Sequence, residues 1–112
     1  MAIAQYGVVL VTIDDLDQGR AIAAALVESR LAACVNLFPV QSVYTWQGQL
    51  QQDDEWQLVI KTDLTHFAAL ETCIHNLHPY DLPEVIALPI VQGSRDYLGW
   101  ISSQVDPNGD GL

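Results

Sequence analysis

Hydrophobic and polar positions divide the first part of the chain into a strand-like and a helix-like stretch. Residues 7–13 (GVVLVTI) form an unbroken apolar run rich in β-branched residues, which is typical of a strand buried on both faces. Residues 16–30 are rich in alanine and lack proline. Apolar side chains recur there at helical spacing, at Leu16, Ala23, Leu26 and Val27. The pattern predicts a strand followed by a helix.

The middle of the chain predicts three further strands. Residues 31–38 form the first, which Pro39 ends, and residues 40–46 alternate as the second, with Tyr44 and Trp46 on one face. Residues 47–49 (QGQ) are a turn, and residues 50–62 form a long third strand. This central hairpin is therefore long, with a break near the proline.

Side-chain parity gives the long strand two different faces. Trp56, Leu58 and Ile60 share the face that suits a core. The opposite face carries Glu55, Gln57, Val59 and Lys61, with opposite charges at its two ends. That second face must lie against water or another subunit.

The last third of the chain predicts helix, strand and helix. Residues 63–78 carry an apolar stripe at helical spacing, with Asp63 or Thr65 as its cap. Pro79 and Pro83 prevent the helix from continuing. Residues 84–91 form a strand in which Pro89 indicates an edge or a bulge, and residues 94–104 form a short closing helix.

This order, β-α-β-β-α-β with a closing helix, is that of an α+β, ferredoxin-like split β-α-β sandwich. It has one antiparallel sheet with both helices on one face, so the other face is open and association is expected to cover it. With 112 residues we expect one domain over 1–105. Residues 106–112 are expected to be a flexible tail whose removal leaves stability unchanged.

Charge excludes some partners. Four Lys/Arg against fourteen Asp/Glu give a net charge of −10. Nucleic acids and anionic membranes require clustered basic residues, so neither is an expected partner. The sequence lacks a recognisable secretory signal or membrane-spanning run, and its two cysteines do not suggest a disulfide scaffold. We therefore expect a cytoplasmic protein.

Few residues suggest chemistry, and each has a structural alternative. Asp14, Asp15 and Asp17 suit a helix N-terminus better than a hard-cation site. Cys34 and Cys73 are interpreted as buried, inert thiols. Tyr44 and Trp46 favour core or subunit packing over a ligand-stacking platform. The sequence shows no nucleophile–base set, so an enzyme is the least favoured class.

The three histidines are more suggestive as a set. His75 and His78 are spaced i, i+3 near a helix end and could share Cu²⁺ or Zn²⁺, whereas His66 lies more than two turns away. Histidines near a helix C-terminus also arise from the dipole preference. Both interpretations are open at this point.

Short motifs follow one another along the chain: LAACVN at 31–36, SVYxWxG at 42–48, Glu55 with IKT at 60–62, HPYxxPE at 78–84 and YLxW at 97–100. In this order they resemble the CutA family of divalent-cation tolerance proteins. The resemblance runs from about Val8 to Ile101. It implies a tight homotrimer like the PII signalling proteins, cytoplasmic residence, and a role linked to copper and other divalent ions.

The resemblance transfers to metal ligands only in part. In members proposed to bind copper, the ligands are a cysteine on the first strand and two adjacent histidines before the Pro-Tyr. This chain has Val11 and Leu77 at two of those positions, which leaves His78 as the matching metal ligand. No cofactor is expected to be obligatory, and Cu²⁺ or another divalent cation is the candidate.

The sequence therefore predicts a trimeric, non-catalytic protein of divalent-cation tolerance. Glu55, Lys61 and Tyr80 are the candidates for polar residues lining an inter-subunit cleft. An ion pair that fixes strand register across the interface is the structural alternative for the two charges. The rival functions are a PII-like sensor binding a small ligand in such clefts, and a rigid scaffold.

Overall fold

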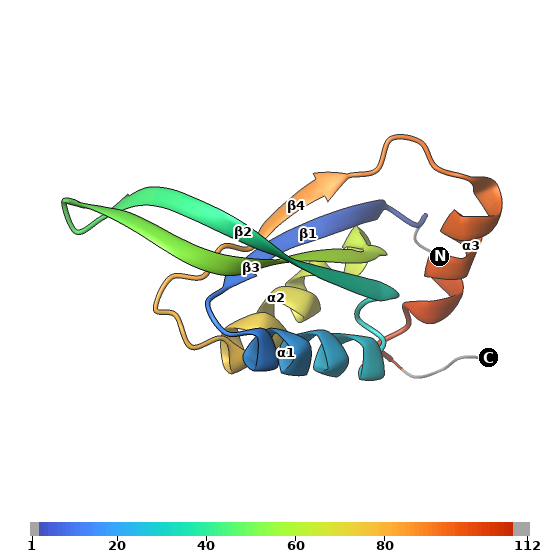
Figure 1. Ribbon diagram of the computed structural model, residues 1–112. Helices are drawn as coiled ribbons and strands as arrows, with labels where there is room; N and C mark the ends of the chain where they lie inside the picture. Colours follow the sequence, from blue (N-terminus) through green and yellow to red (C-terminus); the bar gives the residue numbers. More distant parts are fainter. Residues whose placement is uncertain (1–2, 109–112) are drawn as a thin grey trace.

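A four-stranded antiparallel sheet with two helices on one side forms the body of the molecule (Figure 1). The computed structural model describes residues 3–108. Its elements are β1 (Tyr6–Ile13), α1 (Leu16–Glu28), β2 (Cys34–Trp46), β3 (Gln49–Asp63), the 3-10 helix η1 (Leu64–His66), α2 (Phe67–Leu77), β4 (Ile86–Pro89) and α3 (Arg95–Gln104). The strands lie in the order β2-β3-β1-β4. The predicted α+β architecture is confirmed.

The core lies between the sheet and helices α1 and α2. On β1, Val9, Val11 and Ile13 are fully buried and lie opposite Ile60, Leu58 and Trp56 of β3. The helices complete this core with fully buried side chains, namely Ile22, Leu26, Leu70 and Ile74. The predicted parity of β3 is confirmed. The expectation that residues 7–13 are buried on both faces is wrong, because the alternate positions of β1 are only half-buried.

Strand β2 differs most from its prediction. Residues 31–33 lie in the connection after α1, and residues 34–46 form one strand that runs through Pro39. The expected break at the proline is wrong because β2 is an edge strand. At a sheet edge, a residue without an N–H need not remove a ladder hydrogen bond. Pro89 also follows this rule, because β4 is the opposite edge, although that strand is shorter than expected.

The acidic residues predicted to cap the first two helices differ in what they do. The Asp63 carboxylate accepts a hydrogen bond from the Thr65 backbone N–H at 3.0 Å, so Asp63 caps the 3-10 turn η1. The expected cap of the helix itself is wrong, because α2 begins later, at Phe67, and its N-cap His66 makes no side-chain capping bond. At α1 the N-cap residue is Asp15, but its side chain makes no capping hydrogen bond. Asp17 lies in the first turn, where a negative charge is favoured by the helix dipole.

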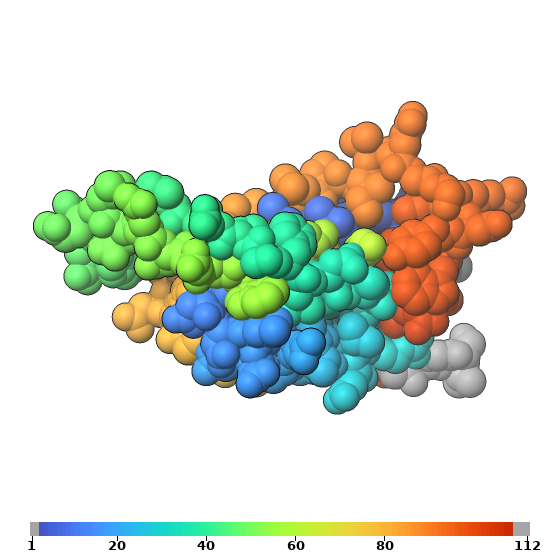
Figure 2. Space-filling model, in the orientation of Figure 1, coloured from blue at the N-terminus to red at the C-terminus, as the bar shows by residue number. Residues whose placement is uncertain are grey.

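The β2–β3 hairpin extends well beyond the rest of the sheet. Strand β1 pairs with β3 only over residues 56–63, whereas β2 pairs with β3 out to Gln49. Residues 41–54 therefore form a two-stranded arm, which Figure 2 shows standing clear of the body. The turn at its tip has positive φ at Gln47 and Gly48, as the right-handed twist of a tight hairpin requires. A free two-stranded ribbon is marginal in water, so this arm favours a partner.

The side of the sheet opposite α1 and α2, here called the open face, is apolar. Its residues follow from the strand register and the alternation of side chains. They include Val8, Leu10, Cys34, Phe38, Val59, Lys61, Ile86 and Leu88. Phe38, Ile86 and Leu88 are 44%, 50% and 44% exposed, which is unusual for large apolar side chains gathered on one surface. Among residues 3–108, no helix is long and apolar enough to cross a membrane.

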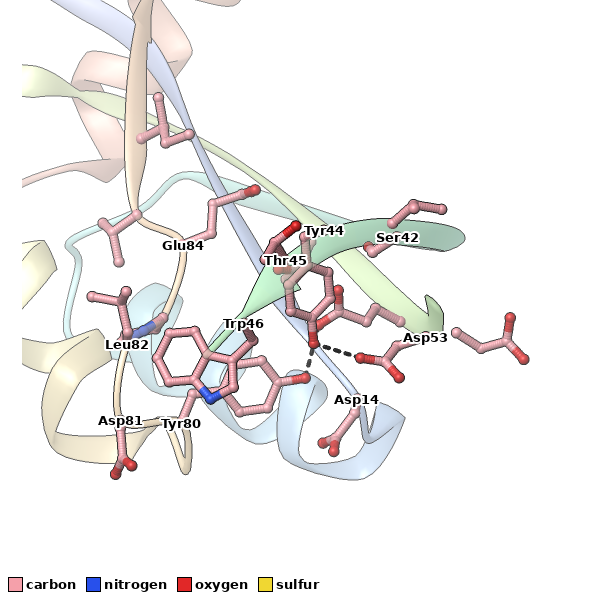
Figure 3. Close-up of a pocket in the computed structure, with 17 residues that line it drawn as sticks. Asp14, Ser42, Tyr44, Thr45, Trp46, Asp53, Tyr80, Asp81, Leu82 and Glu84 are labelled. Atoms are coloured by element: carbon pink, nitrogen blue, oxygen red, sulfur yellow. Dashed lines mark hydrogen bonds between the residues drawn. The ribbon is translucent and has the colours of Figure 1, made fainter. Parts of the chain in front are cut away.

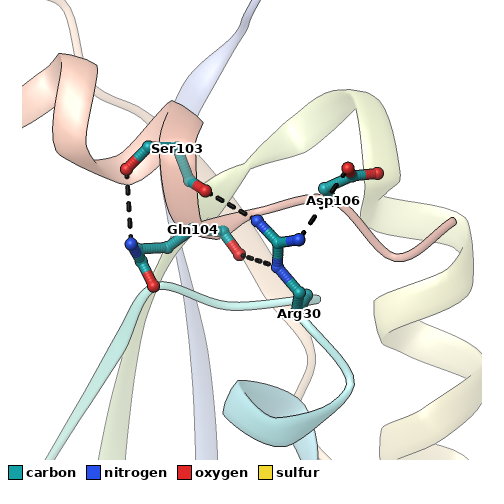
Figure 4. Close-up of polar contacts among 4 residues, drawn as sticks. All are labelled: Arg30, Ser103, Gln104 and Asp106. Carbon is teal, nitrogen blue, oxygen red and sulfur yellow. Dashed lines mark hydrogen bonds and ion pairs between the residues drawn. The ribbon is translucent and has the colours of Figure 1, made fainter. Parts of the chain in front are cut away.

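Arg30 attaches the C-terminal segment to the end of α1 (Figure 4). Its guanidinium donates to the carbonyls of Gln104 and Ser103 at 3.2 and 2.7 Å, so it caps the C-terminus of α3. The Asp106 N–H donates to the Arg30 carbonyl at 2.9 Å, and the Asp106 carboxylate lies 3.9 Å from the guanidinium. Part of the predicted tail, residues 109–112, lies outside the described residues. Asp106 itself is held by the fold.

We expect truncation to separate these two parts of the C-terminus. A chain ending at Asn108 keeps the contacts with Arg30 that are seen among residues 3–108, and it should unfold at the same urea concentration as the full chain. A chain ending at Val105 loses the Asp106 N–H bond and should lose about 1–2 kcal/mol of free energy of unfolding. Equal urea midpoints for the two truncated chains would contradict docking of Asp106.

Candidate functional site

A pocket of about 1060 Å³ lies where the arm meets the sheet and the segment after α2 (Figure 3). Its walls are residues 42–46 of β2, 53–55 of β3, Thr12 and Asp14 after β1, and residues 80–86. Six carboxylates line it, from Asp14, Asp53, Asp54, Glu55, Asp81 and Glu84. Three aromatic rings also line it, from Tyr44, Trp46 and Tyr80. The lining residues include no Lys, Arg or His, so the pocket is strongly acidic.

Glu55 and Tyr80 meet in this pocket, as predicted for two of the cleft residues. The Tyr80 hydroxyl donates to Glu55 Oε2 at 2.8 Å, although the residues lie 25 positions apart. Glu55 is only 6% exposed. Burial, together with the hydrogen bond to the Glu55 carboxylate, raises the pKa of the Tyr80 phenol. The phenol therefore keeps its proton and donates it in a hydrogen bond to a carboxylate that is largely shielded from water.

Lys61, the third predicted cleft residue, lies elsewhere. It is six residues from Glu55 on the extended strand β3, a separation of roughly 20 Å. Its ammonium stands over the ring of Tyr97 in α3, 5.6 Å from the centroid. Within one chain, Lys61 therefore does not join Glu55 and Tyr80.

A second tyrosine–carboxylate pair lies on the arm. The Tyr44 hydroxyl donates to Asp53 Oδ2 at 2.5 Å. Asp53 lies on the neighbouring strand, two residues beyond Gln51, the direct partner of Tyr44, and so on the same face. This hydrogen bond is the main reason that the pKa of Tyr44 is raised to about 12. Tyr44 and Trp46 are 41% and 42% exposed, so the core-packing interpretation of these rings is wrong for a single chain. Subunit packing and ligand stacking stay open for them.

His78 ends α2 and is buried, with both ring nitrogens in use. Its Nδ1 accepts from the Tyr80 backbone N–H at 3.1 Å, so this nitrogen carries no proton. Its Nε2 lies 2.8 Å from the Thr12 carbonyl and must therefore donate. The ring also packs edge-on against Tyr80, with centroids 4.6 Å apart. A metal ion could bind either nitrogen only by breaking one of these hydrogen bonds.

The other candidate ligands do not gather around His78. His75 is exposed and lies 3.8 Å from the Glu71 carboxylate, and Leu77 is half-exposed at a family copper-ligand position. Val11, at the position of the family's first-strand cysteine, is fully buried in the core. Within residues 3–108, no group of three His, Cys, Asp or Glu side chains is placed to hold a metal ion. A metal site at His78 stays a prediction.

The two cysteines occupy different environments. Cys73 packs against the core from α2, and burial raises the pKa of its thiol. Cys34 is partly exposed and lies on the open face opposite Lys61. Its predicted full burial is therefore not reached within one chain, and depends on what covers the open face.

Comparison with known proteins gives this architecture a family. The model of the CutA1 divalent ion tolerance protein family matches residues 7–104. The chain belongs to the CutA1 family. The Divalent-cation tolerance protein CutA of Thermus thermophilus is 48% identical over 95 residues, which are 84% of this chain and 92% of that protein. The chloroplastic Protein CutA of Arabidopsis thaliana is 44% identical over 97 residues, covering 86% of this chain and 53% of that protein.

Solved CutA1 structures share the fold. A structure of the Thermus thermophilus protein superposes with a TM-score of 0.87 at 45% identity, covering 90% of this chain and 99% of that one. CutA1 from Oryza sativa superposes with a TM-score of 0.89 at 40% identity, covering 92% and 95% of the two chains. The resemblance seen in the sequence motifs is confirmed.

Sequence reasoning missed part of the pocket of this CutA1 family member. Asp53 was not singled out, although it holds Tyr44, and neither was Glu84, whose Oε2 accepts from the Gln57 side chain at 3.3 Å. The available signal was the alternation of Tyr44 and Trp46 with polar residues on β2, opposite the polar run at 51–54. The exact pairing of Tyr44 with Gln51 was needed to bring Asp53 beside it, and the sequence does not show that register.

The Tyr44–Asp53 pair predicts how this phenol titrates. In Asp53→Asn, the pKa of Tyr44 should fall from about 12 toward its ordinary value of 10, because the charged acceptor that favours the protonated phenol is gone. Since the raised pKa belongs to the folded state, the pair's contribution to stability is complete below pH 10 and is lost as pH rises through 12. Tyrosinate absorbance against pH measures the shift. Asp54→Asn is the matched control, and an equal shift in both variants would contradict the pairing.

Proposed function

We propose that this chain is a non-catalytic divalent-cation tolerance protein that works as a homotrimer. The proposal rests on family membership over almost the whole chain, combined with an apolar open face that the chain's own helices leave uncovered. The relatives are named as divalent-cation tolerance proteins, and their names state no enzymatic activity. The pocket offers carboxylates and phenols without a nucleophile–base pair, which supports a binding role over a catalytic one.

The open face supports association, and the number of three copies follows from the resemblance to the family. An antiparallel sheet that packs helices on one face only is stable in water when its other face is polar. Here that face carries large apolar side chains, and the arm adds Val43 and Leu50, each 66% exposed. Apolar surface of this extent is typical of subunit interfaces. A trimer would remove the apolar open faces from water and would give each two-stranded arm a surface to pack against.

The place of action is proposed from the sequence alone. A cytoplasmic protein agrees with two cysteines that are free thiols. Named relatives include a chloroplastic protein from Arabidopsis thaliana and a structure described as the periplasmic divalent cation tolerance protein of Archaeoglobus fulgidus. Family membership by itself is therefore compatible with several compartments.

The PII-like sensor is the second candidate function, and the pocket is the observation that favours it. A concave site with three aromatic rings and convergent carboxylates suits a small ligand that carries a positive charge. A metabolite that raises the melting temperature, where divalent metals do not, would select this candidate over cation tolerance.

The trimer is tested by placing charge on the open face. Phe38→Asp combined with Leu88→Asp should give a monomer by light scattering, because two carboxylates would be buried at each interface. The core on the other side of the sheet is untouched, so circular dichroism should show a folded chain. Cys34 should then react faster with a thiol reagent, since the face that covers it is removed. Val27→Asp, at an exposed apolar position on α1, is the matched control and should stay trimeric. A wild-type monomer at micromolar concentration would overturn the assembly.

Copper binding at His78 is tested separately. Because both ring nitrogens are occupied, we expect native mass spectrometry with one Cu²⁺ per chain to show little bound copper. At excess Cu²⁺, uptake should fall in His78→Ala but not in His75→Ala. Tight stoichiometric binding by the wild type that His78→Ala abolishes would contradict the closed geometry. Equal uptake by wild type and His78→Ala at excess copper would contradict the ligand assignment.

A further inference from the structure

The pocket holds a charge that its own chain does not balance. Glu55 is only 6% exposed, and its hydrogen-bond partner is the neutral phenol of Tyr80. Buried carboxylates in proteins are normally paired with a cation, because desolvation of an isolated charge is costly. Five more carboxylates line the same pocket. Among the described residues, no Lys or Arg reaches any of these six carboxylates in an ion pair.

The chain has few cations from which a partner could come. Its four basic residues are Arg20, Arg30, Lys61 and Arg95. Arg30 is held by α3 and Asp106 at the far end of α1. Arg20 lies on α1, in the helix layer and not on the open face. Arg95 begins α3 and does not lie on the sheet. Lys61 therefore is the cation on the same face of β3 as Glu55, and it projects toward Tyr97.

Lys61 is itself without a carboxylate partner among residues 3–108. Its contact is the half-exposed ring of Tyr97, and a cation over an exposed ring contributes only about 0.5–1 kcal/mol. An unpaired carboxylate and an unpaired ammonium thus lie at opposite ends of one apolar surface, roughly 20 Å apart along β3. Neither can reach the other inside one chain, but a second copy laid along the same surface can bring them together.

We infer that Lys61 of one copy enters the acidic pocket of the next copy and pairs with the Glu55 carboxylate that Tyr80 holds. This inference rests on the proposed homotrimer and adds its specific contact. Made head-to-tail under a threefold rotation, this contact closes into a ring of three copies. The pair also offsets the repulsion between chains of net charge −10 at the point where their acidic pockets approach another copy. Each pocket is then a composite site, incomplete without its neighbour's lysine.

A zero-length carbodiimide cross-link tests the contact directly. Lys61 is the one lysine in the sequence, so apart from the N-terminal amine it alone can form an amide with a carboxylate. We expect the wild-type protein to give covalent dimer and trimer on a denaturing gel, with a Lys61–Glu55 linked peptide by mass spectrometry. A twofold dimer with the same contact would stop at the covalent dimer, which would support the pairing and overturn the ring.

Two conservative variants make the result specific. Lys61→Arg keeps the charge but forms no stable cross-link, so it should stay trimeric by light scattering while the covalent products disappear. Glu55→Gln keeps the hydrogen bond from Tyr80 and should lose the same linked peptide. Lys61→Glu should lower the fraction of trimer, and the exchange Lys61→Glu with Glu55→Lys should restore it.

Other outcomes would overturn the inference without touching the proposed function. A wild-type trimer whose Lys61 links to no carboxylate, or to one outside the pocket, would show that the copies assemble by another contact. Linkage to Glu84 in place of Glu55 would keep the lysine in the pocket and overturn Glu55 as its partner. A wild-type monomer would overturn the homotrimer itself.

Discussion

The antiparallel pairing of β1 with β3 is the constraint on which the rest of the molecule depends. It sets Val9 beside Ile60 and Val11 beside Leu58, so that one side of two central strands becomes the floor of the core. Helices α1 and α2 pack onto that floor with fully buried isoleucines and leucines. A shift of one residue would place these side chains on the opposite face and leave the helices without a partner. The large amount of apolar area buried here therefore fixes the register of the whole sheet.

The same register determines what the other side of the sheet presents. Because side chains alternate, burying Leu58 and Ile60 forces Val59 and Lys61 outward, together with the apolar residues opposite them on β1 and β4. The chain then has an apolar surface that its own length cannot cover, since its third helix packs at the end of the sheet near Tyr6 and Ala33. Folding of one chain thus generates the requirement for association, and the requirement is a property of the strands and not of any loop.

The site follows from the way the arm extends. Where β1 ends, β3 continues with β2 alone, and residues 80–86 after α2 close over the gap. Glu55 lies at this junction, and His78 orients the turn that brings Tyr80 to it, through bonds to Thr12 and to the Tyr80 N–H. His78 therefore uses both ring nitrogens in the fold, and a metal ion at either nitrogen would have to displace a hydrogen bond. CutA1 proteins at 40–48% identity match this chain over most of its length, so the scaffold tolerates extensive change in sequence.

The sequence by itself determined the order of elements, the core face of β3 and the family. These properties are local: they depend on alternation, on helical spacing and on short motifs, which neighbouring residues alone can specify. Only the tertiary structure decided that Pro39 lies inside a continuous edge strand, that Tyr80 reaches Glu55 across 25 residues, and that Lys61 lies far from both. Those facts depend on strand order, register and the packing of a distant loop. They arise from burying apolar area between segments far apart in the chain, which no local pattern records.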